Sequence, residues 1–138
     1  MVYSIVYVSS SSGLLADEEL ESIISKSRLN NSEKDITGVL LYCNGNIIQV
    51  LEGAEETVMD TFRRILRDHR HTQVTRLFAG MVPDRSFQKW SMGYSTMTSK
   101  DMGELKAAFP AIDNPHKRDL TGKTLSLIKN FYINNHRN

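Results

Sequence analysis

Two polar side chains interrupt strand-like apolar patterns in the first half of the chain. In "NIIQVLEG", Ile47, Gln49 and Leu51 share one face of an extended segment, so Gln49 stands in line with two aliphatic residues. Tyr7 occupies a similar setting within "SIVYVSS". A buried amide left unpaired costs about 1–3 kcal/mol, so Gln49 needs a partner. A phenol can be that partner, and an amide offers an acceptor at one end and a donor at the other.

The totals of the sequence restrict the class of protein. With 138 residues, 17 Lys and Arg against 16 Asp and Glu, and a net charge of +1, the chain fits one nearly neutral domain. We therefore expect no nucleic-acid or membrane partner, and no apolar run approaches the roughly 18–20 residues that span a bilayer. The start of the chain lacks a signal-peptide pattern, which favours a cytoplasmic protein. A single cysteine and four scattered histidines predict neither a disulfide nor a metal site.

Hydrophobic periodicity predicts alternating strands and helices. The asparagine and glycine in "NGN" between two apolar runs indicate a tight hairpin. The expected order is βαββαββ, an α+β ferredoxin-like fold in which one mixed sheet carries two helices on one face. Strands one and three are then central neighbours, so Tyr7 and Gln49 can meet on the helix-covered face. The predicted strands are residues 1–10, 35–43, 46–53, 73–82 and 91–98, and the helices lie within 10–31 and 54–70.

The composition changes after Lys100, and the sequence predicts two further helices, 100–109 and 119–135. We therefore divide the chain into a core domain, 1–98, and a C-terminal helical extension, 99–138. The last helix has an amphipathic stripe that either covers the open face of the sheet or contacts a partner or second copy. The stripe consists of Leu120, Thr124, Leu127, Ile128 and Phe131.

The interrupting residues suggest a cavity with a few convergent polar groups. Its apolar walls would include Ile5, Ile23, Leu40 and Ile65. Amides and a phenol suit a planar heteroaromatic ring with a lactam edge, and basic residues suit phosphate. An isolated hydrogen bond between Tyr7 and Gln49 in an ordinary core explains those two residues without any ligand. Further polar residues expected near the cavity mouth are Asn31, Arg64, Arg67, Asp68, Arg70 and His71.

Five segments in order resemble one protein family. They are "IVYVS", "NN" followed by "DITGVLLY", "NIIQVLEG", "RILRDHRH" and "RSFQKWSMGY". Together they resemble the BLUF family of flavin-binding blue-light sensors, over roughly residues 3–95. The resemblance implies the ferredoxin-like fold inferred above, with the flavin held between the two helices of the core domain.

The resemblance also implies roles for individual residues. FAD, or alternatively FMN, would bind non-covalently between the helices, with Gln49 placed between Tyr7 and flavin O4 and N5. Asn31 would bond the carbonyl edge of the ring, beside a more variable Asn30. Arg67 and His71 match the cofactor region, although a helix C-terminus attracts basic residues in any case. The full implied binding set is Tyr7, Ile23, Asn30, Asn31, Leu40, Gln49, Arg64, Ile65, Arg67, Asp68 and His71.

By the same resemblance, the excited flavin would take an electron and a proton from Tyr7 and return them through Gln49. The amide would rotate or tautomerise, which strengthens its bond to the flavin and shifts the absorption to the red. A hydrogen-bond change of about 0.5–1.5 kcal/mol can only bias a nearby bistable contact. Trp90 and Met92 are the expected relay, and the sequence leaves open which faces the flavin. Simple packing is the other explanation for Trp90.

No catalysis on a substrate is expected, because nothing after Ser99 resembles an enzymatic output domain. A short member of this family would signal through contacts with an unidentified protein partner, often as a homo-oligomer. Ile47 departs from the family, which often has an aromatic residue there. Competing functions on this fold are an RNA-binding module, an acylphosphatase-like hydrolase and an interaction domain without ligand. An RNA-binding module would need the RNP pattern, and an acylphosphatase-like hydrolase would need an arginine in the loop after the first strand; the sequence has neither. All three functions predict a colourless protein.

Overall fold

The computed structural model describes residues 1–11, 16–68, 71–108 and 123–135. Within them the chain forms two strand–helix–strand passages, which are followed by one further strand and two helices. The elements are β1 Val2–Ser11, α1 Asp17–Glu33, β2 Thr37–Cys43, β3 Asn46–Gly53, α2 Glu55–Arg67, β4 His71–Val82, β5 Gly93–Thr96, α3 Ser99–Ala108 and α4 Lys123–Asn135.

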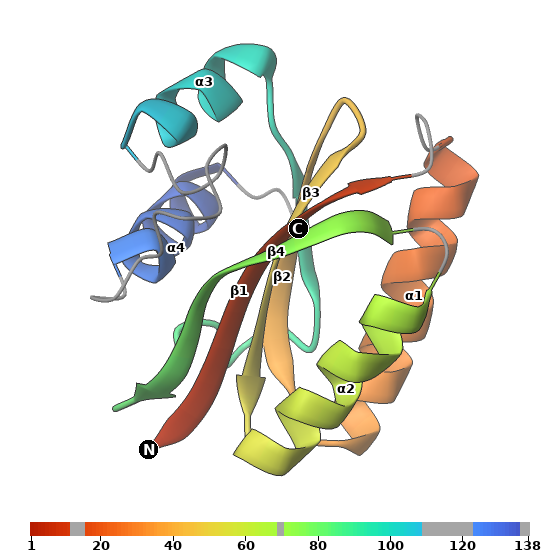
Figure 1. Cartoon of the computed structure of the whole chain (residues 1–138), viewed down its shortest axis with the longest axis vertical. Coiled ribbons are helices and arrows are strands. Elements are labelled where there is room, and N and C mark those ends of the chain that lie inside the picture. Colours follow the sequence, from red (N-terminus) through yellow and green to blue (C-terminus); the bar gives the residue numbers. More distant parts are fainter. Residues whose placement is uncertain (12–15, 69–70, 109–122, 136–138) are drawn as a thin grey trace.

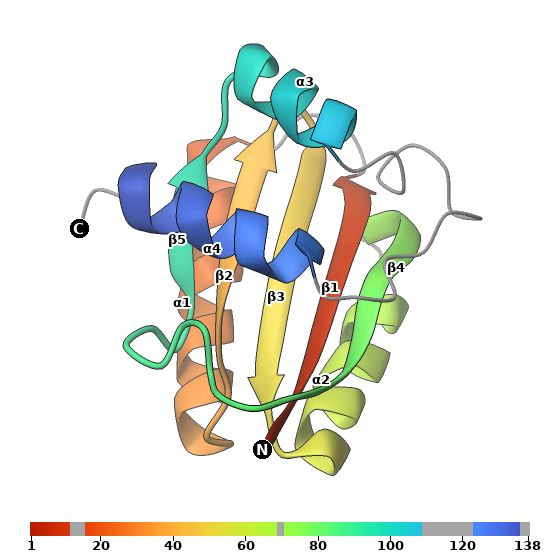
Figure 2. The same ribbon diagram turned by 90° about the vertical axis from the view of Figure 1, so that its left-hand side faces the viewer.

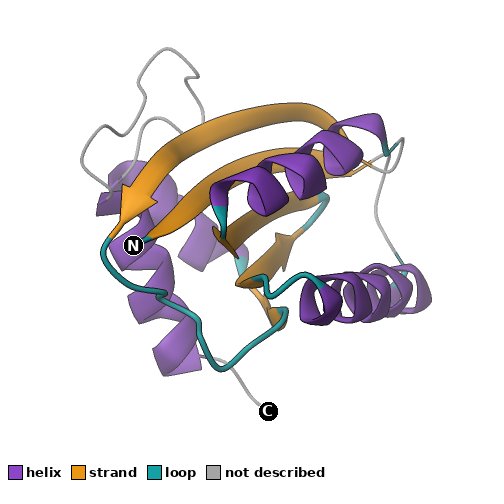
Figure 3. Ribbon diagram, turned by 90° about the horizontal axis from the view of Figure 1, so that it is seen from below, coloured by secondary structure: helices purple, strands orange, loops and turns teal. Residues whose placement is uncertain are grey.

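One mixed five-stranded sheet organises the protein, in the order β4-β1-β3-β2-β5. Strand β1 runs antiparallel to both β3 and β4, β2 runs antiparallel to β3, and only β5 is parallel to its neighbour β2. Helices α1 and α2 cover one face of the sheet (Figure 1), and α4 lies across the strands on the opposite face (Figure 2). The view from below shows the sheet between these two helical layers (Figure 3). The predicted α+β ferredoxin-like fold is confirmed.

The β2–β3 hairpin fixes which face Gln49 occupies. Asn44 and Gly45 have φ angles of 44° and 87°, the positive values that a tight two-residue hairpin turn of this hand requires. This turn sets a register in which Leu40 pairs with Gln49, and on the other side β1 places Tyr7 opposite Gln49. A slip of one residue would move every side chain of the strand to the other face. The turn chemistry therefore brings Tyr7 and Gln49 together.

Both faces of the sheet are buried, each under its own pair of helices. On the α1–α2 face the strands contribute Ile5, Tyr7, Leu40, Ile47 and Leu51 to a cluster with residues of both helices. The opposite face is covered by α3 and α4, whose buried residues are Met102, Leu105, Leu125, Ile128 and Tyr132.

The stripe expected on the last helix is partly wrong. Leu127 is 37% exposed, whereas Leu125 and Tyr132 are buried beside the correctly predicted Ile128. Compared with the predicted orientation, the helix is turned about its axis so that Tyr132 packs on Gly93. Any Cβ at Gly93 would collide with the Tyr132 hydroxyl. Of the remaining predicted stripe, Phe131 is partly buried, Leu120 lies outside the described residues, and so does the side chain of Thr124.

Several element ends differ from the predictions, and the largest differences concern α1, α2 and the last strand. Helix α1 continues beyond the expected stop at Asn31 to Glu33 and ends before Asp35, whose φ of 54° is left-handed and cannot continue a helix. Helix α2 ends at Arg67 rather than residue 70, and residues 69–70 lie outside the described part of the chain. The last strand is shorter than 91–98, since β5 covers only Gly93–Thr96. Residues 90–92 therefore precede the strand instead of alternating along it.

A buried carboxylate ties the connection between β4 and β5 to the sheet. Glu52 is 0% exposed, and its Oε1 accepts hydrogen bonds from the Phe87 N–H at 2.6 Å and the Thr37 hydroxyl at 2.9 Å. Its Oε2 accepts from the Ser86 N–H at 2.8 Å. Arg85 adds a hydrogen bond to the Glu52 carbonyl oxygen at 3.3 Å. The connection that carries residues 87–92 is thus fixed against β2 and β3.

We predict that Glu52→Gln destabilises the fold by about 1–3 kcal/mol, because an amide cannot accept at both ends and would point an N–H group at a backbone N–H. Urea unfolding monitored by circular dichroism measures the change. Glu33→Gln, at an exposed position near the end of α1, is the matched control and should stay within about 0.5 kcal/mol of the wild type. Equal stability of both variants would contradict this role of Glu52.

Candidate functional site

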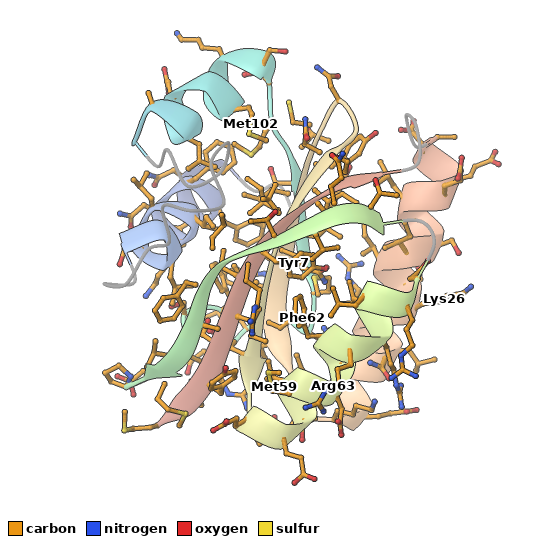
Figure 4. The ribbon with its side chains drawn as sticks, viewed as in Figure 1. Tyr7, Lys26, Met59, Phe62, Arg63 and Met102 are labelled. Carbon is orange, nitrogen blue, oxygen red and sulfur yellow. The ribbon has the colours of Figure 1, made fainter. Side chains whose placement is uncertain are left out.

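A hydrogen-bonded chain of three buried side chains lies beneath α1 and α2. The Tyr7 hydroxyl donates to Oε1 of Gln49, and Nε2 of Gln49 donates to Sδ of Met92 at 3.7 Å. Tyr7 is 0% exposed and Met92 is 1% exposed. Figure 4 shows Tyr7 between the sheet and α2, and the ring of Phe62 on α2 lies 5.4 Å from the Tyr7 ring, centroid to centroid. Both ends of the Gln49 amide are therefore engaged, one by a donor and the other by a soft acceptor.

The environment of Tyr7 keeps its hydroxyl protonated. Burial raises the pKa of Tyr7 well above the ordinary value for tyrosine, and the nearby charge of Asp68 raises this pKa further. A tyrosinate in this position would lose its hydration and face a carboxylate. The Tyr7 hydroxyl is consequently a donor to Gln49 at neutral pH and remains one where an ordinary tyrosine begins to ionise.

A cavity of about 230 Å³ opens between α1 and α2 above Gln49. Aliphatic side chains from both helices and from β3 form its walls, and amide, hydroxyl and charged groups converge on it, the usual composition of a ligand pocket. Its lining residues are Ile23, Lys26, Ser27, Asn30, Asn31, Gln49, Leu51, Thr61, Arg64, Ile65 and Asp68.

Charged and polar side chains from both helices surround the cavity mouth. Arg64 Nη1 on α2 donates to Asn30 Oδ1 on α1 at 3.3 Å, so this pair joins the two helices. Lys26 of α1 adds a second positive charge and points away from the sheet (Figure 4). Asp68 supplies a negative charge at the same rim. The mouth is suited to a ligand that carries phosphate, provided that the phosphate lies on the side of Lys26 and Arg64.

Thr61 places a buried hydroxyl on the cavity wall. Its side chain is 5% exposed, and Oγ1 makes no hydrogen bond with the residues that the structure describes. Native proteins rarely leave such a group unsatisfied. A ligand with a polar edge in the cavity would supply the missing bond.

Asn31 connects the cavity to the segment before β5. It is 1% exposed, and its Nδ2 donates to the Ser91 carbonyl oxygen at 2.6 Å. The same residue lines the cavity. Since an amide nitrogen carries two hydrogens and its oxygen can accept, Asn31 can hold a ligand and the Ser91 carbonyl at once.

The structure brings most of the sequence-predicted site residues to one place. Ile23, Asn30, Asn31, Gln49, Arg64, Ile65 and Asp68 line the cavity, and Tyr7 lies directly behind Gln49.

Six predicted site residues lie elsewhere or cannot be placed. Ile5 is buried in the apolar cluster under α1 and α2 but does not line the cavity, and Arg70 lies outside the described residues. Leu40 is buried in the same apolar cluster but does not line the cavity. Arg67 is exposed and also lies outside the lining, with its Nε donating to the Arg63 carbonyl oxygen at 3.4 Å. His71 begins β4, and its side chain is outside the described part of the structure. Trp90 lies on the opposite face of the sheet.

The two relay candidates are thus separated by the sheet. Met92 belongs to the cluster under α1 and α2 and contacts Gln49. Trp90 packs against Tyr132 of α4, with ring centroids 5.0 Å apart, and against Phe87 at 6.4 Å. In this structure Met92 is therefore the residue on the Gln49 side.

Sequence reasoning missed several lining residues. Lys26, Ser27 and Thr61 are polar residues on helices, where they are usually solvated, and Leu51 looks like ordinary core. For Thr61 a signal was available, because it follows Val58 by three positions and precedes Ile65 by four, on one helix face.

Residues 2–93 match the family model described as BLUF, sensors of blue-light using FAD. The chain belongs to the BLUF family. BLUF domains are flavin-binding photoreceptor modules, so the cavity between α1 and α2 lies in a domain of that kind. Two further findings concern the described residues: no helix among them is long and apolar enough to cross a membrane, and they contain no cluster of potential metal ligands.

Known BLUF proteins include both long and short relatives of this chain. It is 29% identical over 112 residues to a photoactivated adenylate cyclase beta subunit from Euglena gracilis, a match that covers 80% of this chain and 12% of that protein. It is 35% identical over 75 residues to the blue light- and temperature-regulated antirepressor BluF of Escherichia coli, covering 54% of this chain and 19% of that protein. The chain therefore spans only a small part of these curated relatives.

Two solved structures match nearly end to end. BlsA in its photo-activated state aligns with a TM-score of 0.78 at 25% identity, covering 100% of this chain and 99% of BlsA. The dark-state structure of BlrB, a BLUF protein, aligns with a TM-score of 0.68 at 27% identity, covering 94% and 92% of the two chains. Both confirm the fold of this BLUF protein.

We predict a pH dependence of stability that comes from Tyr7. The unfolded chain loses this proton near the ordinary tyrosine pKa of 10.0, whereas the folded BLUF domain, in which the pKa is raised, keeps it. The free energy of unfolding should then fall as pH rises above about 10, by up to about 1.4 kcal/mol per pH unit for this one proton. Urea unfolding of wild type and Tyr7→Phe at pH values of about 8 and about 11 tests it.

Tyr7→Phe should show the shallower fall between these two pH values. Tyr3→Phe, at the half-buried start of β1, is the control and should keep the wild-type slope. If wild type and Tyr7→Phe lose the same stability over this range, Tyr7 is not held protonated by the fold.

Proposed function

We propose that this chain is a blue-light photoreceptor that binds FAD non-covalently between α1 and α2 and uses Gln49 as its switch. The observation that carries the proposal is the position of one amide. Gln49 lies at the cavity floor and is shared between the Tyr7 hydroxyl and the Met92 sulfur. Such an amide can exchange its donor and acceptor ends without any change in the surrounding backbone.

The residues of the cavity fit a flavin ring. Ile23, Leu51 and Ile65 offer apolar contacts to its faces, and the Thr61 hydroxyl lacks a partner among the described residues. A volume of about 230 Å³ lies below the roughly 300–1,000 Å³ of pockets for drug-sized ligands, so the cavity suits the ring alone. The remainder of the cofactor would extend through the mouth, where Lys26 and Arg64 can pair with phosphate.

The chemistry of the switch follows from Tyr7 and Gln49. A bound flavin absorbs blue light and becomes a strong electron acceptor when excited. An electron from Tyr7 would go to the excited flavin, and its proton would follow the hydrogen bond to Gln49 Oε1, because oxidation makes a phenol strongly acidic. Both would return to Tyr7 when the amide has changed its arrangement. Rotation or tautomerisation of the amide then removes its N–H donor from Met92 Sδ. Each exchanged hydrogen bond is worth about 0.5–1.5 kcal/mol.

The output of the switch would pass through the segment before β5. Met92 touches Gln49 on one side of the sheet, and Trp90 and Gly93 touch Tyr132 of α4 on the other. A shift of this short segment would change how α4 packs on the sheet. We propose that a protein partner or a second copy of the chain reads this change, and no transformation of a separate substrate is part of the proposal.

The proposal is tested by visible spectra in the dark and just after blue light. We expect a yellow protein whose absorption shifts reversibly to the red by a small amount. Gln49→Leu should keep the colour and lose the shift, because leucine offers neither donor nor acceptor. Gln88→Leu, an exposed glutamine in the β4–β5 connection, is the control and should shift like the wild type.

Two results would contradict the proposal in different ways. A protein that stays colourless after addition of FAD does not bind flavin in this cavity. A yellow Gln49→Leu variant that still shifts would show that another group is the switch.

Thr61→Val tests the contact of the cavity wall with the cofactor. Valine keeps the shape and removes the unsatisfied hydroxyl, so flavin-free protein should become equally or more stable. Flavin affinity should fall roughly 2- to 10-fold, the loss of one hydrogen bond. Thr57→Val, one turn earlier on α2 and half-buried, is the matched control. Unchanged affinity, measured by fluorescence titration with FAD, would remove Thr61 from the binding site.

A further inference from the structure

Residues 90–92 are held in place by donors from outside their own segment. The Gly38 N–H donates to the Trp90 carbonyl oxygen at 3.0 Å. Asn31 Nδ2 donates to the Ser91 carbonyl oxygen at 2.6 Å, and Arg28 Nε donates to the Met92 carbonyl oxygen at 2.9 Å. Three successive carbonyl groups are therefore fixed just before β5 begins at Gly93.

Two of these donors come from one face of α1. Arg28 and Asn31 are three residues apart, which places their side chains side by side on a helix. Asn31 faces the cavity, whereas Arg28 does not line it. Arg28 instead lines a separate surface groove between α1 and β5, together with Asp17, Glu21 and Tyr94. Arg28 thus reaches the Met92 backbone from outside the cofactor site.

Met92 takes part in two contacts of different strength, one with Arg28 through its backbone and one with Gln49 through its sulfur. The hydrogen bond from Gln49 to Met92 has a sulfur acceptor at 3.7 Å, so it depends strongly on where the methionine sits. A methionine side chain has three rotatable bonds and adopts many positions unless its backbone is fixed. The Met92 carbonyl oxygen accepts its hydrogen bond from a charged guanidinium group, which makes the stronger class of hydrogen bond.

We propose that Arg28 is a positioning residue of the light switch: it fixes Met92 so that its sulfur receives the Gln49 amide. The inference rests on the proposed photoreceptor function. After the amide has turned away from Met92, the Arg28 bond keeps the sulfur where the returning N–H will find it. Without that bond Met92 occupies other positions, the dark arrangement is less favourable, and the return to it is slower.

A pair of substitutions isolates the donor from the charge. Arg28→Gln and Arg28→Met both remove the positive charge, and both residues are good helix formers. The side-chain nitrogen of glutamine follows the same number of carbon atoms as Nε of arginine, so Arg28→Gln retains an N–H donor there. Arg28→Met has none. Arg63→Met, exposed on α2 and paired with Asp60 at 2.8 Å, controls for loss of an arginine elsewhere.

The measurement is the rate at which the red-shifted absorption returns in the dark, in flavin-loaded protein of matched occupancy. Arg28→Met should recover roughly 3- to 10-fold more slowly than Arg28→Gln, the factor that one hydrogen bond supplies. Arg28→Gln and Arg63→Met should stay close to the wild type. If Arg28→Met does not accumulate as folded protein, Arg28→Leu provides a second side chain without a donor.

A second comparison tests that Arg28 acts through Met92. In a Met92→Leu background the sulfur acceptor is gone, so the difference between Arg28→Gln and Arg28→Met should disappear. Equal recovery of these two variants in the wild-type background, or faster recovery of Arg28→Met, would overturn the inference. A difference that persists unchanged in the Met92→Leu background would also overturn it. A wild-type protein without any red shift is a distinct result, since it refutes the proposed function itself.

Discussion

The amide of Gln49 is the constraint on which the rest of the structure depends. It is a polar group on an apolar strand face, and it is nearly fully buried, so both of its ends must be satisfied from within the protein. Tyr7 can reach it only if β1 and β3 pair in the observed register. Met92 can reach it only if the segment before β5 is fixed beside β2, the strand next to β3. The positive φ angles at Asn44 and Gly45 fix the hairpin register, and Glu52 fixes the connection that leads to Met92.

The relative sizes of the energies decide what such an amide can do to the opposite face. Helix α4 is held by the buried side chains of Leu125, Ile128 and Tyr132, and burying one such side chain is worth about 1.5–3 kcal/mol. One exchanged hydrogen bond, about 0.5–1.5 kcal/mol, is smaller than their sum and cannot detach the helix. This free energy is comparable to the difference between two packing arrangements of one aromatic ring. In the proposed mechanism, the contact of Tyr132 with Trp90 and Gly93 is therefore the part of α4 that would respond.

The sequence predicted the sheet and its two covering helices because these depend on local periodicity and on one strong turn. It also predicted that Tyr7 and Gln49 meet, because the ferredoxin-like order makes their two strands neighbours and alternation can put both residues on the helix-covered face. What it left open depends on contacts distant in sequence. The separation of Met92 from Trp90 follows from an irregular segment whose carbonyl groups are held by α1, and no period describes such a segment. The stripe of α4 was misplaced because Tyr132 fits over Gly93, a match of shape that neither residue reveals alone.

The position of Cys43 excludes a covalent thiol adduct with a ligand in the cavity. It is the single cysteine of the chain, and it is buried in the cluster under α3 and α4, on the face opposite Gln49. A thiol adduct in the cavity would require that side chain to cross the sheet, which the strand register forbids. On the cavity side Tyr7 is the phenol that is hydrogen-bonded to Gln49, and its burial favours the protonated hydroxyl. In the proposed photocycle, the proton that leaves Tyr7 would go to Gln49 and return along the same hydrogen bond, which would make the cycle reversible.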